Sequence, residues 1–251
     1  MFSTYDFGYS WPITFGPLVP LALAAAVAAA ALWRGWPRWV VLAGALVAAW
    51  ALAALLVLHA FLQINAPMTI PTERFLASGA GRVLDAGAGS GRGAIGVLLA
   101  RPTATVTGLD LYDGYWGIDD NTPERFMANA RAAGVADRAE ALRGDMRRMP
   151  FDDAAFAAVV SAYALDHLRG EDRVAALAEA ARVLGPDGQF LLLGINVDWM
   201  AWLASPLHIA HHSRPDLPAW RAAIERSGFA IEEEGRRPAT WYVLARKRPA
   251  R

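Results

Sequence analysis

The chain has 251 residues, enough for one full α/β domain with a small appendage but not for two ordinary domains. Its 24 basic and 24 acidic residues leave no net charge, which argues against a polyanionic partner, so we expect no nucleic acid to bind. Cysteine is absent, which excludes disulfides, thiolate metal sites and any mechanism with a cysteine nucleophile.

Two apolar runs dominate the first sixty residues. They cover residues 18–33 and 39–63 and are interrupted only by the pentapeptide at 34–38. From Trp39 to Leu62 there is no charged residue, and these residues reach about 36 Å as a helix, enough to cross a hydrocarbon core of about 30 Å. The first run reaches only about 24 Å, so it needs the residues just before it, or a thinner bilayer, to span.

We therefore predict a membrane-anchoring helical hairpin at residues 1–64, with membrane contact through residues 13–63. Tryptophans near the ends of the runs support this, because indole rings prefer the interface. A cleaved signal peptide is a weaker alternative, since no basic segment precedes the first run. A soluble core or an oligomer interface is the other alternative. Whether the hairpin spans the bilayer or dips into one leaflet stays open.

Beyond residue 65, short β-like runs alternate with amphipathic helices, which is typical of a parallel sheet built from βαβ units. One helix is well defined, since Thr122 can cap its start, Pro123 suits its first position and Gly134 can end it. A second helix, Glu171–Leu184, is expected to end at a turn formed by residues 185–188. The strand candidates are Arg82–Ala86, Thr105–Asp110, Ala139–Arg143, Ala155–Ser161, Gln189–Gly194, Ala230–Glu234 and Thr240–Arg246.

A glycine-rich turn follows the first of these strands, in the sequence RVLDAGAGSGRG at 82–93. Gly87, Gly89 and Gly91 let the backbone turn sharply and admit a ligand where a Cβ would collide. The spacing differs from the G-x-G-x-x-G of dinucleotide enzymes, which makes a nicotinamide oxidoreductase a poorer alternative. The acid just ahead, Asp85, suits a cationic amino-acid ligand such as S-adenosylmethionine and would repel a pyrophosphate.

The segment VLDAGAGSGRG resembles the first signature of class I S-adenosylmethionine-dependent methyltransferases, in the subgroup similar to ubiquinone and menaquinone methyltransferases. Four further segments resemble that family in the expected order, at 107–110, 144–151, 156–168 and 182–188. The last departs from the family's R-x-L-(K/R)-P-G-G turn at two positions, which affects a turn and not the site. The resemblance implies an α/β fold over residues 65–251: a Rossmann-like, seven-stranded, mostly parallel sheet with helices on both faces.

The resemblance also implies roles for individual side chains. Asp110 would bind the ribose hydroxyls, since two acceptor oxygens suit a vicinal diol. Asp145 would receive the adenine amino group, Met146 would pack on the ring, and Ser161 would lie near the sulfonium. The predicted cofactor-binding residues are Asp85, Gly87, Ala88, Gly89, Gly91, Asp110, Leu111, Asp145, Met146 and Ser161.

Methyl transfer from a sulfonium is an in-line displacement that chiefly requires two reactants to be aligned and desolvated, with no nucleophile on the enzyme. Where the acceptor carries a proton, a general base helps, and the catalytic candidates follow the fourth strand: Tyr163, Asp166 and His167. His167 is the best of them, because imidazole exchanges protons near neutral pH. A merely solvated or capping histidine is the alternative.

Two aromatic segments, 112–117 and 196–212, are predicted walls of the acceptor site. The spacing of His208, His211 and His212 is compatible with one helical face, but no fourth ligand is in view, so we predict no metal site. A membrane anchor favours a small apolar or membrane-partitioned acceptor, such as a quinone, a lipid or a hydrophobic thiol.

The alternative function is a membrane-anchored S-adenosylmethionine-binding sensor or scaffold without turnover. We expect the cytoplasmic membrane of a bacterium as the location, with the catalytic domain facing the cytosol. The sequence leaves the oligomeric state open.

Overall fold

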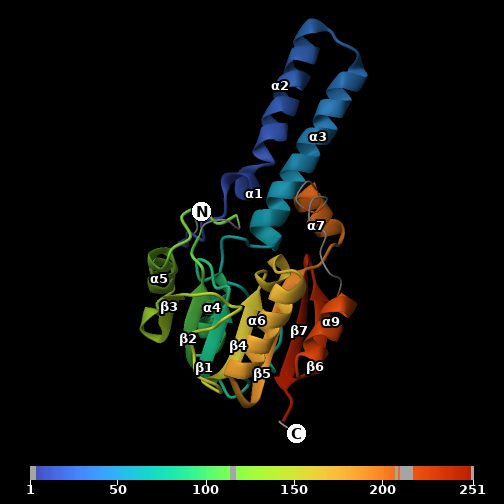
Figure 1. Cartoon of the computed structure of the whole chain (residues 1–251). Coiled ribbons are helices and arrows are strands. Elements are labelled where there is room, and N and C mark those ends of the chain that lie inside the picture. The colour runs from blue at the N-terminus through green and yellow to red at the C-terminus, as the bar shows by residue number, and fades with distance from the viewer. Residues whose placement is uncertain (1–3, 114–116, 207–208, 210–216, 250–251) are drawn as a thin grey trace. The chain divides into compact units, whose positions relative to one another are not determined.

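The computed structural model of the protein describes residues 4–113, 117–206, 209 and 217–249, and the chain divides into two compact units (Figure 1). The sheet unit contains residues 4–8, 65–196 and the described residues from 217 onward. The hairpin unit contains residues 9–64 and the described part of 197–213. This division differs from the expected boundary after residue 64, because each unit also takes a segment from elsewhere in the chain.

The sheet unit is built on a seven-stranded sheet in the order β3-β2-β1-β4-β5-β7-β6. All neighbouring strands run parallel except β7, which is antiparallel to both β5 and β6. This confirms the predicted Rossmann-like, mostly parallel sheet. The strands are β1 Ala80–Ala86, β2 Thr103–Asp110, β3 Ala139–Arg143, β4 Phe156–Ala162, β5 Leu184–Ile195, β6 Phe229–Arg237 and β7 Thr240–Lys247.

Helices surround this sheet (Figure 1). They are α4 Arg92–Ala100, α5 Pro123–Ala132, α6 Gly170–Val183 and α9 Leu217–Arg226, with the short 3-10 turns η2 Ala136–Arg138 and η3 Leu165–His167. The start of α5 follows from its sequence, since the Thr122 hydroxyl accepts the Arg125 backbone N–H at 3.2 Å. Gly134, with φ of +70°, follows the end of α5 as predicted.

The start of β5 corrects one prediction. Residues 185–188 were expected to form a turn, but the strand already begins at Leu184, directly after α6. The register with β4 jumps from Leu184 to Gln189, and Asp187 has a φ of +57°. The residues expected as a turn therefore form an irregular entry to the strand, because Leu184 pairs with Phe156 before the chain bulges.

The core of the sheet unit is aromatic at the β5 side. Phe190 packs on Phe229 with ring centroids 5.2 Å apart, and Trp220 of α9 packs on Trp241 of β7 at 6.0 Å. Trp220 and Phe229 are fully buried. These contacts tie α9, β6 and β7 to the parallel strands, so the antiparallel edge belongs to the same core.

The described residues of the hairpin unit form two long antiparallel helices and three short elements (Figure 1). The elements are α1 Trp11–Phe15, α2 Leu18–Arg34, α3 Arg38–Leu56, the π-helical turn η1 Val57–Phe61 and α7 Trp199–Ala204. Small residues let α2 and α3 approach closely: a Cβ at Gly44 would lie 3.1 Å from the Ala24 carbonyl oxygen and 3.2 Å from the Ala28 Cβ.

The large apolar side chains of this hairpin point outward. Ala31, Ala51 and Ala54 are fully buried between the helices, whereas Leu46 is 72% and Leu42 65% exposed. Among the described residues one helix, Arg38–Phe61, is long and apolar enough to cross a bilayer, with a mean hydropathy of 2.6.

Candidate functional site

The predicted cofactor residues gather at the carboxyl end of the sheet, where the strand order reverses. The chain runs from β1 outward to β2 and β3 and then returns to place β4 on the other side of β1. Ligands of open α/β sheets bind at such a switch point, outside the carboxyl ends of the strands. Asp85 near the end of β1, Asp110 at the end of β2 and Ser161 near the end of β4 all lie at this edge.

The glycine turn after β1 has the conformation that its sequence predicts. Gly87, Gly89 and Gly91 all have positive φ, at +82°, +50° and +92°. A Cβ on Gly87 would lie 2.3 Å from the Cβ of Ala164 and 2.8 Å from the Met146 methyl group. The turn is therefore closely packed between the segment after β3 and the segment after β4, and Gly87 tolerates no side chain.

Asp85 is a buried carboxylate, and neither of its oxygens has a hydrogen-bond partner among the described residues. Burial raises the pKa of Asp85 to about 7. The nearby backbone N–H of Ala94 lowers the pKa, although it does not reach hydrogen-bond geometry, and the negative charge of Asp110 raises it further. A Cβ on Gly93 would come within 2.8 Å of the Asp85 Oδ2 atom, so a glycine in α4 makes room for the carboxylate. A buried unpaired carboxylate is costly, and a cationic ligand group would compensate it.

Asp110 is held in place by three donors. The Gly89 N–H donates to one carboxylate oxygen at 2.8 Å, and the Tyr112 N–H and the Asn121 side-chain amide donate to the other at 2.8 and 3.0 Å. A carboxylate has about four lone-pair positions, so roughly one stays available to a ribose hydroxyl. The same contacts fix the glycine turn to the end of β2. The three donors therefore fix the orientation of Asp110 and leave it about one further hydrogen bond.

Asp145 is engaged by a residue that sequence reasoning did not include. Arg147 donates to it through its backbone N–H at 2.8 Å and through its guanidinium at 2.6 to 3.0 Å, and also pairs with Asp172 at 3.1 Å. The side-chain hydrogen bond from Arg147 holds the pKa of Asp145 below its ordinary value. Met146, in contrast, lies directly against Gly87. An adenine amino group would therefore share Asp145 with Arg147.

The residues after β4 lie close to the glycine turn. Ser161 is buried and donates its hydroxyl to the Ala86 carbonyl oxygen at 2.7 Å, so it joins the ends of β4 and β1. The Tyr163 hydroxyl lies 2.7 Å from the Thr240 hydroxyl. Asp166 and His167 belong to the turn η3, which starts one residue after Ala164 and is therefore adjacent to Gly87. The three catalytic candidates therefore follow the carboxyl end of β4, beside the glycine turn.

The first residues of the chain also reach this site, which the sequence did not indicate. Phe7 is buried, and its carbonyl oxygen accepts the Ser90 hydroxyl at 2.6 Å. Asn129 of α5 accepts the Asp6 N–H at 2.9 Å and donates to the carbonyl oxygens of Asp6 and Ser90 at 2.8 and 3.0 Å. Residues 4–8 thus form a strap that is fastened to the glycine turn and to α5.

Tyr112 and Asn121 are further buried polar residues beside Asp110. The Tyr112 hydroxyl and the Asn121 Oδ1 atom lack a hydrogen-bond partner in the described part of the chain. Burial and the charges of Asp110 and Asp85 raise the pKa of Tyr112, so its hydroxyl stays a donor at neutral pH. Both residues follow Asp110 closely in the sequence and contact its carboxylate. That short separation is the signal by which the sequence could have indicated them.

Two predicted cofactor-binding residues remain, Ala88 and Leu111, and the two predicted acceptor walls are described only in part. Leu111 is exposed at 41%, and Ala88 is buried with its N–H on the Leu109 carbonyl oxygen. His208, His211 and His212 lie outside the described residues, as do residues 114–116.

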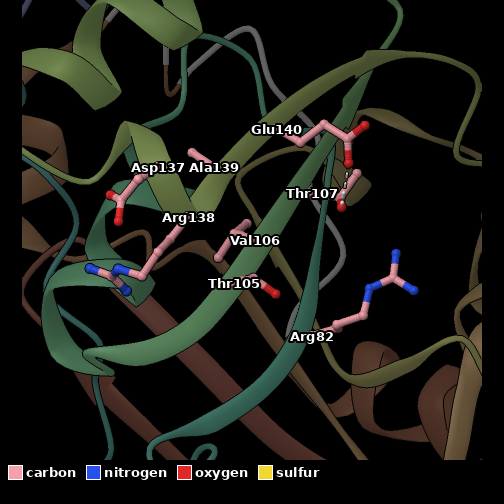
Figure 2. Close-up of a pocket in the computed structure, with 8 residues that line it drawn as sticks. All are labelled: Arg82, Thr105, Val106, Thr107, Asp137, Arg138, Ala139 and Glu140. Atoms are coloured by element: carbon pink, nitrogen blue, oxygen red, sulfur yellow. Dashed lines mark hydrogen bonds between the residues drawn. The ribbon is translucent and has the colours of Figure 1, made fainter.

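A cavity of about 210 Å³ lies elsewhere, on β1, β2, β3 and η2 (Figure 2). It holds none of the predicted site residues. Its lining consists of Arg82, Thr105, Val106, Thr107, Asp137, Arg138, Ala139 and Glu140. The Arg138 guanidinium is already bound to the carbonyl oxygens of Arg101, Ala104 and Leu98. Glu140 accepts the Thr107 hydroxyl at 3.2 Å. We assign no ligand to this cavity, because its polar groups are largely satisfied within the protein.

The residues at the sheet edge fit S-adenosylmethionine in their donor and acceptor types. Asp85 supplies a buried negative charge for a ligand that carries an ammonium and a sulfonium group. Asp110 and Asp145 supply acceptors, and Met146 supplies an apolar surface beside the glycine turn.

Residues 83–188 match the family model described as a methyltransferase domain. This segment contains the glycine turn, the three acids and the residues after β4.

Solved structures with the same fold include an O-methyltransferase family protein from Burkholderia thailandensis, at 15% identity and a TM-score of 0.59 over 94% of this chain and 73% of that one. An S-adenosylmethionine-dependent methyltransferase from Methanosarcina mazei is 19% identical, with a TM-score of 0.52 over 67% of this chain and 93% of that one. The cyclase SpnF is also similar, at 19% identity and a TM-score of 0.57 over 71% and 79% of the two chains. Likeness at these identities concerns the fold.

Proposed function

We propose that the chain is a methyltransferase that uses S-adenosylmethionine, because residues 83–188 match a methyltransferase-domain model and contain the glycine turn and the three acids. We propose further that its methyl acceptor is a small apolar molecule that partitions into membranes. The classes of acceptor are those expected from the sequence: a quinone, a lipid or a hydrophobic thiol. The sequence resemblance to ubiquinone and menaquinone methyltransferases supports the quinone.

One observation carries this proposal: the hairpin unit is built with its small residues inside and its large apolar residues outside. Gly44 and several alanines form the contact between α2 and α3, and Leu42 and Leu46 are exposed. Burying apolar area contributes about 25 cal/mol per Å², so leaving these side chains in water would be unfavourable. Lipid tails are a solvent in which this arrangement is stable.

The strap supports a definite membrane topology. Residues 4–8 are fastened to Ser90 and Asn129 of the sheet unit, and the chain returns to that unit at residue 65. Both ends of the hydrophobic segment therefore belong on the side of the catalytic domain. In this proposal α2 and α3 cross the bilayer together or dip into it together, and we place the catalytic domain in the cytosol of a bacterium, at its cytoplasmic membrane.

The chain's own residues would act chiefly by binding and alignment. The bound cofactor supplies an electrophilic methyl group. Asp85 would balance the positive charge of the amino-acid part, Asp110 would hold the ribose, and Ser161 would keep the ends of β1 and β4 together beside it. For an acceptor with an exchangeable proton, His167 is the proposed base.

Methyl transfer to extracted material tests this proposal. The full-length protein in lipid nanodiscs is given S-adenosylmethionine labelled on the methyl group, together with either an organic or an aqueous extract of bacterial cells. We expect label in an apolar product from the organic extract only, and none with the Asp85→Ala variant. Label confined to water-soluble products would refute the acceptor class. Binding of the cofactor without transfer to any fraction would favour the sensor or scaffold alternative.

A further inference from the structure

Helix α7 is the described part of the hairpin unit that comes from the second half of the chain. It follows β5, whose last residue is Ile195, and its start is capped by Asp198, which accepts the backbone N–H groups of Met200 and Ala201 at 3.0 Å. Its buried side chains pack on the base of the hairpin. The cluster consists of Val57, Leu58, Leu62, Ile64, Met200, Leu203 and Ala204.

The opposite face of α7 is aromatic and exposed. Trp199 is 70% and Trp202 46% exposed, and their i, i+3 spacing places them on one face of the helix. Between Trp199 and Ala204 the helix has no charged residue. An exposed apolar face of this kind favours a partner that is apolar around the two indole rings. The same partner has to offer hydrogen-bond acceptors to the indole N–H groups.

Other aromatic side chains are exposed at the same end of the hairpin. Phe61 ends the turn η1 against which α7 packs, and it is 64% exposed. Phe15 of α1 stacks on His59 of η1 at a centroid distance of 5.6 Å, and the His59 Nε2 atom lies 3.0 Å from the Thr14 carbonyl oxygen. We call the set Trp11, Phe15, Phe61, Trp199 and Trp202 the base collar.

A second aromatic group lies at the other end of the hairpin, where Trp33, Trp36 and Trp39 are exposed beside Arg34 and Arg38. Trp39 and Phe61 are 22 residues apart, which corresponds to about 33 Å along a helix at 1.5 Å per residue. That separation matches a hydrocarbon core of about 30 Å, and the stretch between the two groups has no charged residue. Two aromatic groups at this spacing are the pattern of a membrane-embedded segment, in which indoles mark both interfaces.

We propose that the base collar, including α7, lies in the headgroup region of the bilayer on the side of the catalytic domain. This rests on the proposed membrane function and adds to it a lipid contact outside residues 13–63. Helix α7 begins at Trp199, shortly after β5 ends at Ile195. In this proposal the chain that leaves the carboxyl end of β5 therefore continues into the membrane–water interface. An acceptor dissolved in the bilayer would meet that segment without first passing into water.

Single-cysteine labelling tests this, because the natural chain contains no cysteine. Three full-length variants, Trp202→Cys, Leu46→Cys and Val174→Cys, receive an environment-sensitive fluorophore and are placed in nanodiscs of zwitterionic and anionic phospholipid. Leu46 is the bilayer reference, and Val174 of α6, which is 62% exposed, is the matched control in the sheet unit. Spin-labelled lipids then quench the fluorophore at a shallow or a deep position. Unchanged binding of S-adenosylhomocysteine verifies that each variant is folded.

We expect the label at position 202 to lose fluorescence mainly to the shallow quencher, the label at 46 mainly to the deep one, and the label at 174 to neither. If the label at position 202 is quenched by neither lipid while the label at position 46 is quenched, the proposed location of the base collar is refuted and the membrane proposal stands. If 46 is not quenched either, the membrane proposal itself fails. Cross-linking of two chains through position 202, without quenching, would replace the lipid by a second copy as the partner and also overturn the collar.

Discussion

Replacing Asp85 by asparagine should make the empty protein more stable at alkaline pH while removing its affinity for the cofactor. Burial raises the pKa of this carboxyl from 3.8 to about 7. The folded protein therefore keeps a proton that the unfolded chain releases, so stability falls as the pH rises from about 4 to about 7 and then stays constant. An asparagine has the same shape and no charge, and so escapes this cost.

The size of the effect follows from the pKa shift. At 1.36 kcal/mol per pH unit, the charge costs about 4 kcal/mol at pH 8 and about 2 kcal/mol at pH 5. The asparagine amide carries its own burial cost, but that cost does not change with pH. The informative quantity is therefore the difference between the two pH values, about 2 to 3 kcal/mol in favour of Asp85→Asn, or roughly 5 to 10 °C in the midpoint of thermal unfolding.

The assay is thermal unfolding of the detergent-solubilised full-length protein and the variant at pH 5 and pH 8, without cofactor. Calorimetry with S-adenosylmethionine accompanies it, and we expect the affinity of the natural protein to rise as the pH is increased toward and past 7, because a cation binds the ionised carboxylate. Asp110→Asn is the control, since this residue accepts three hydrogen bonds and its loss should destabilise at both pH values. The reasoning is refuted if the difference in unfolding midpoint between Asp85→Asn and the natural protein is the same at pH 5 and pH 8. It is also refuted if the variant binds the cofactor normally.

Further predictions concern the turn, the strap, the core and the base. Gly87→Ala should abolish cofactor binding measured by calorimetry, because a Cβ there would lie 2.3 Å from a neighbouring carbon atom and φ is positive; normal binding would contradict the packed turn. Asn129→Ala should weaken the affinity for S-adenosylhomocysteine by about tenfold, because it removes two hydrogen bonds to Asp6 of the strap and one to Ser90 of the glycine turn. Ser227→Ala, which loses a hydrogen bond to the Ala223 carbonyl oxygen in another part of the sheet unit, should not. Trp220→Ala should cost about 3 to 5 kcal/mol of stability in denaturant unfolding, and a loss below 1 kcal/mol would contradict its burial. His167→Gln should lower kcat by roughly a hundredfold or more with an unchanged dissociation constant for the cofactor; an unchanged kcat would remove His167 as the base.

The parallel sheet was predictable because its signals are local. Strands β1, β2 and β4 are short runs with consecutive buried residues. The glycine turn needs positive φ within a few residues of Asp85. The same holds for the start of α5, where Thr122 and Pro123 act on their immediate neighbours. The irregular start of β5 was not predictable, since the pairing of Leu184 with Phe156 overrides the turn preference of residues 185–188.

The parts of the site that the sequence did not indicate depend on contacts between distant residues. The strap joins Asp6 to Asn129 across 123 positions, and neither residue has a local pattern that points to the other. The helix α7 joins the hairpin through Met200 and Leu58, again far apart in the chain. Arg147 was missed for a different reason: it sits two residues from Asp145, but only the folded turn shows that the two side chains form an ion pair.

The most direct test of the account compares two acceptors with the same reactive group, a hydroquinone with an isoprenoid tail and the same hydroquinone without it. Methyl transfer to each is measured with the full-length protein in nanodiscs, at equal total acceptor concentration. The account predicts a kcat/KM for the tailed acceptor that is at least tenfold higher, because partitioning concentrates it in the bilayer. Equal values for the two acceptors, or a preference for the water-soluble one, would contradict a membrane-partitioned substrate.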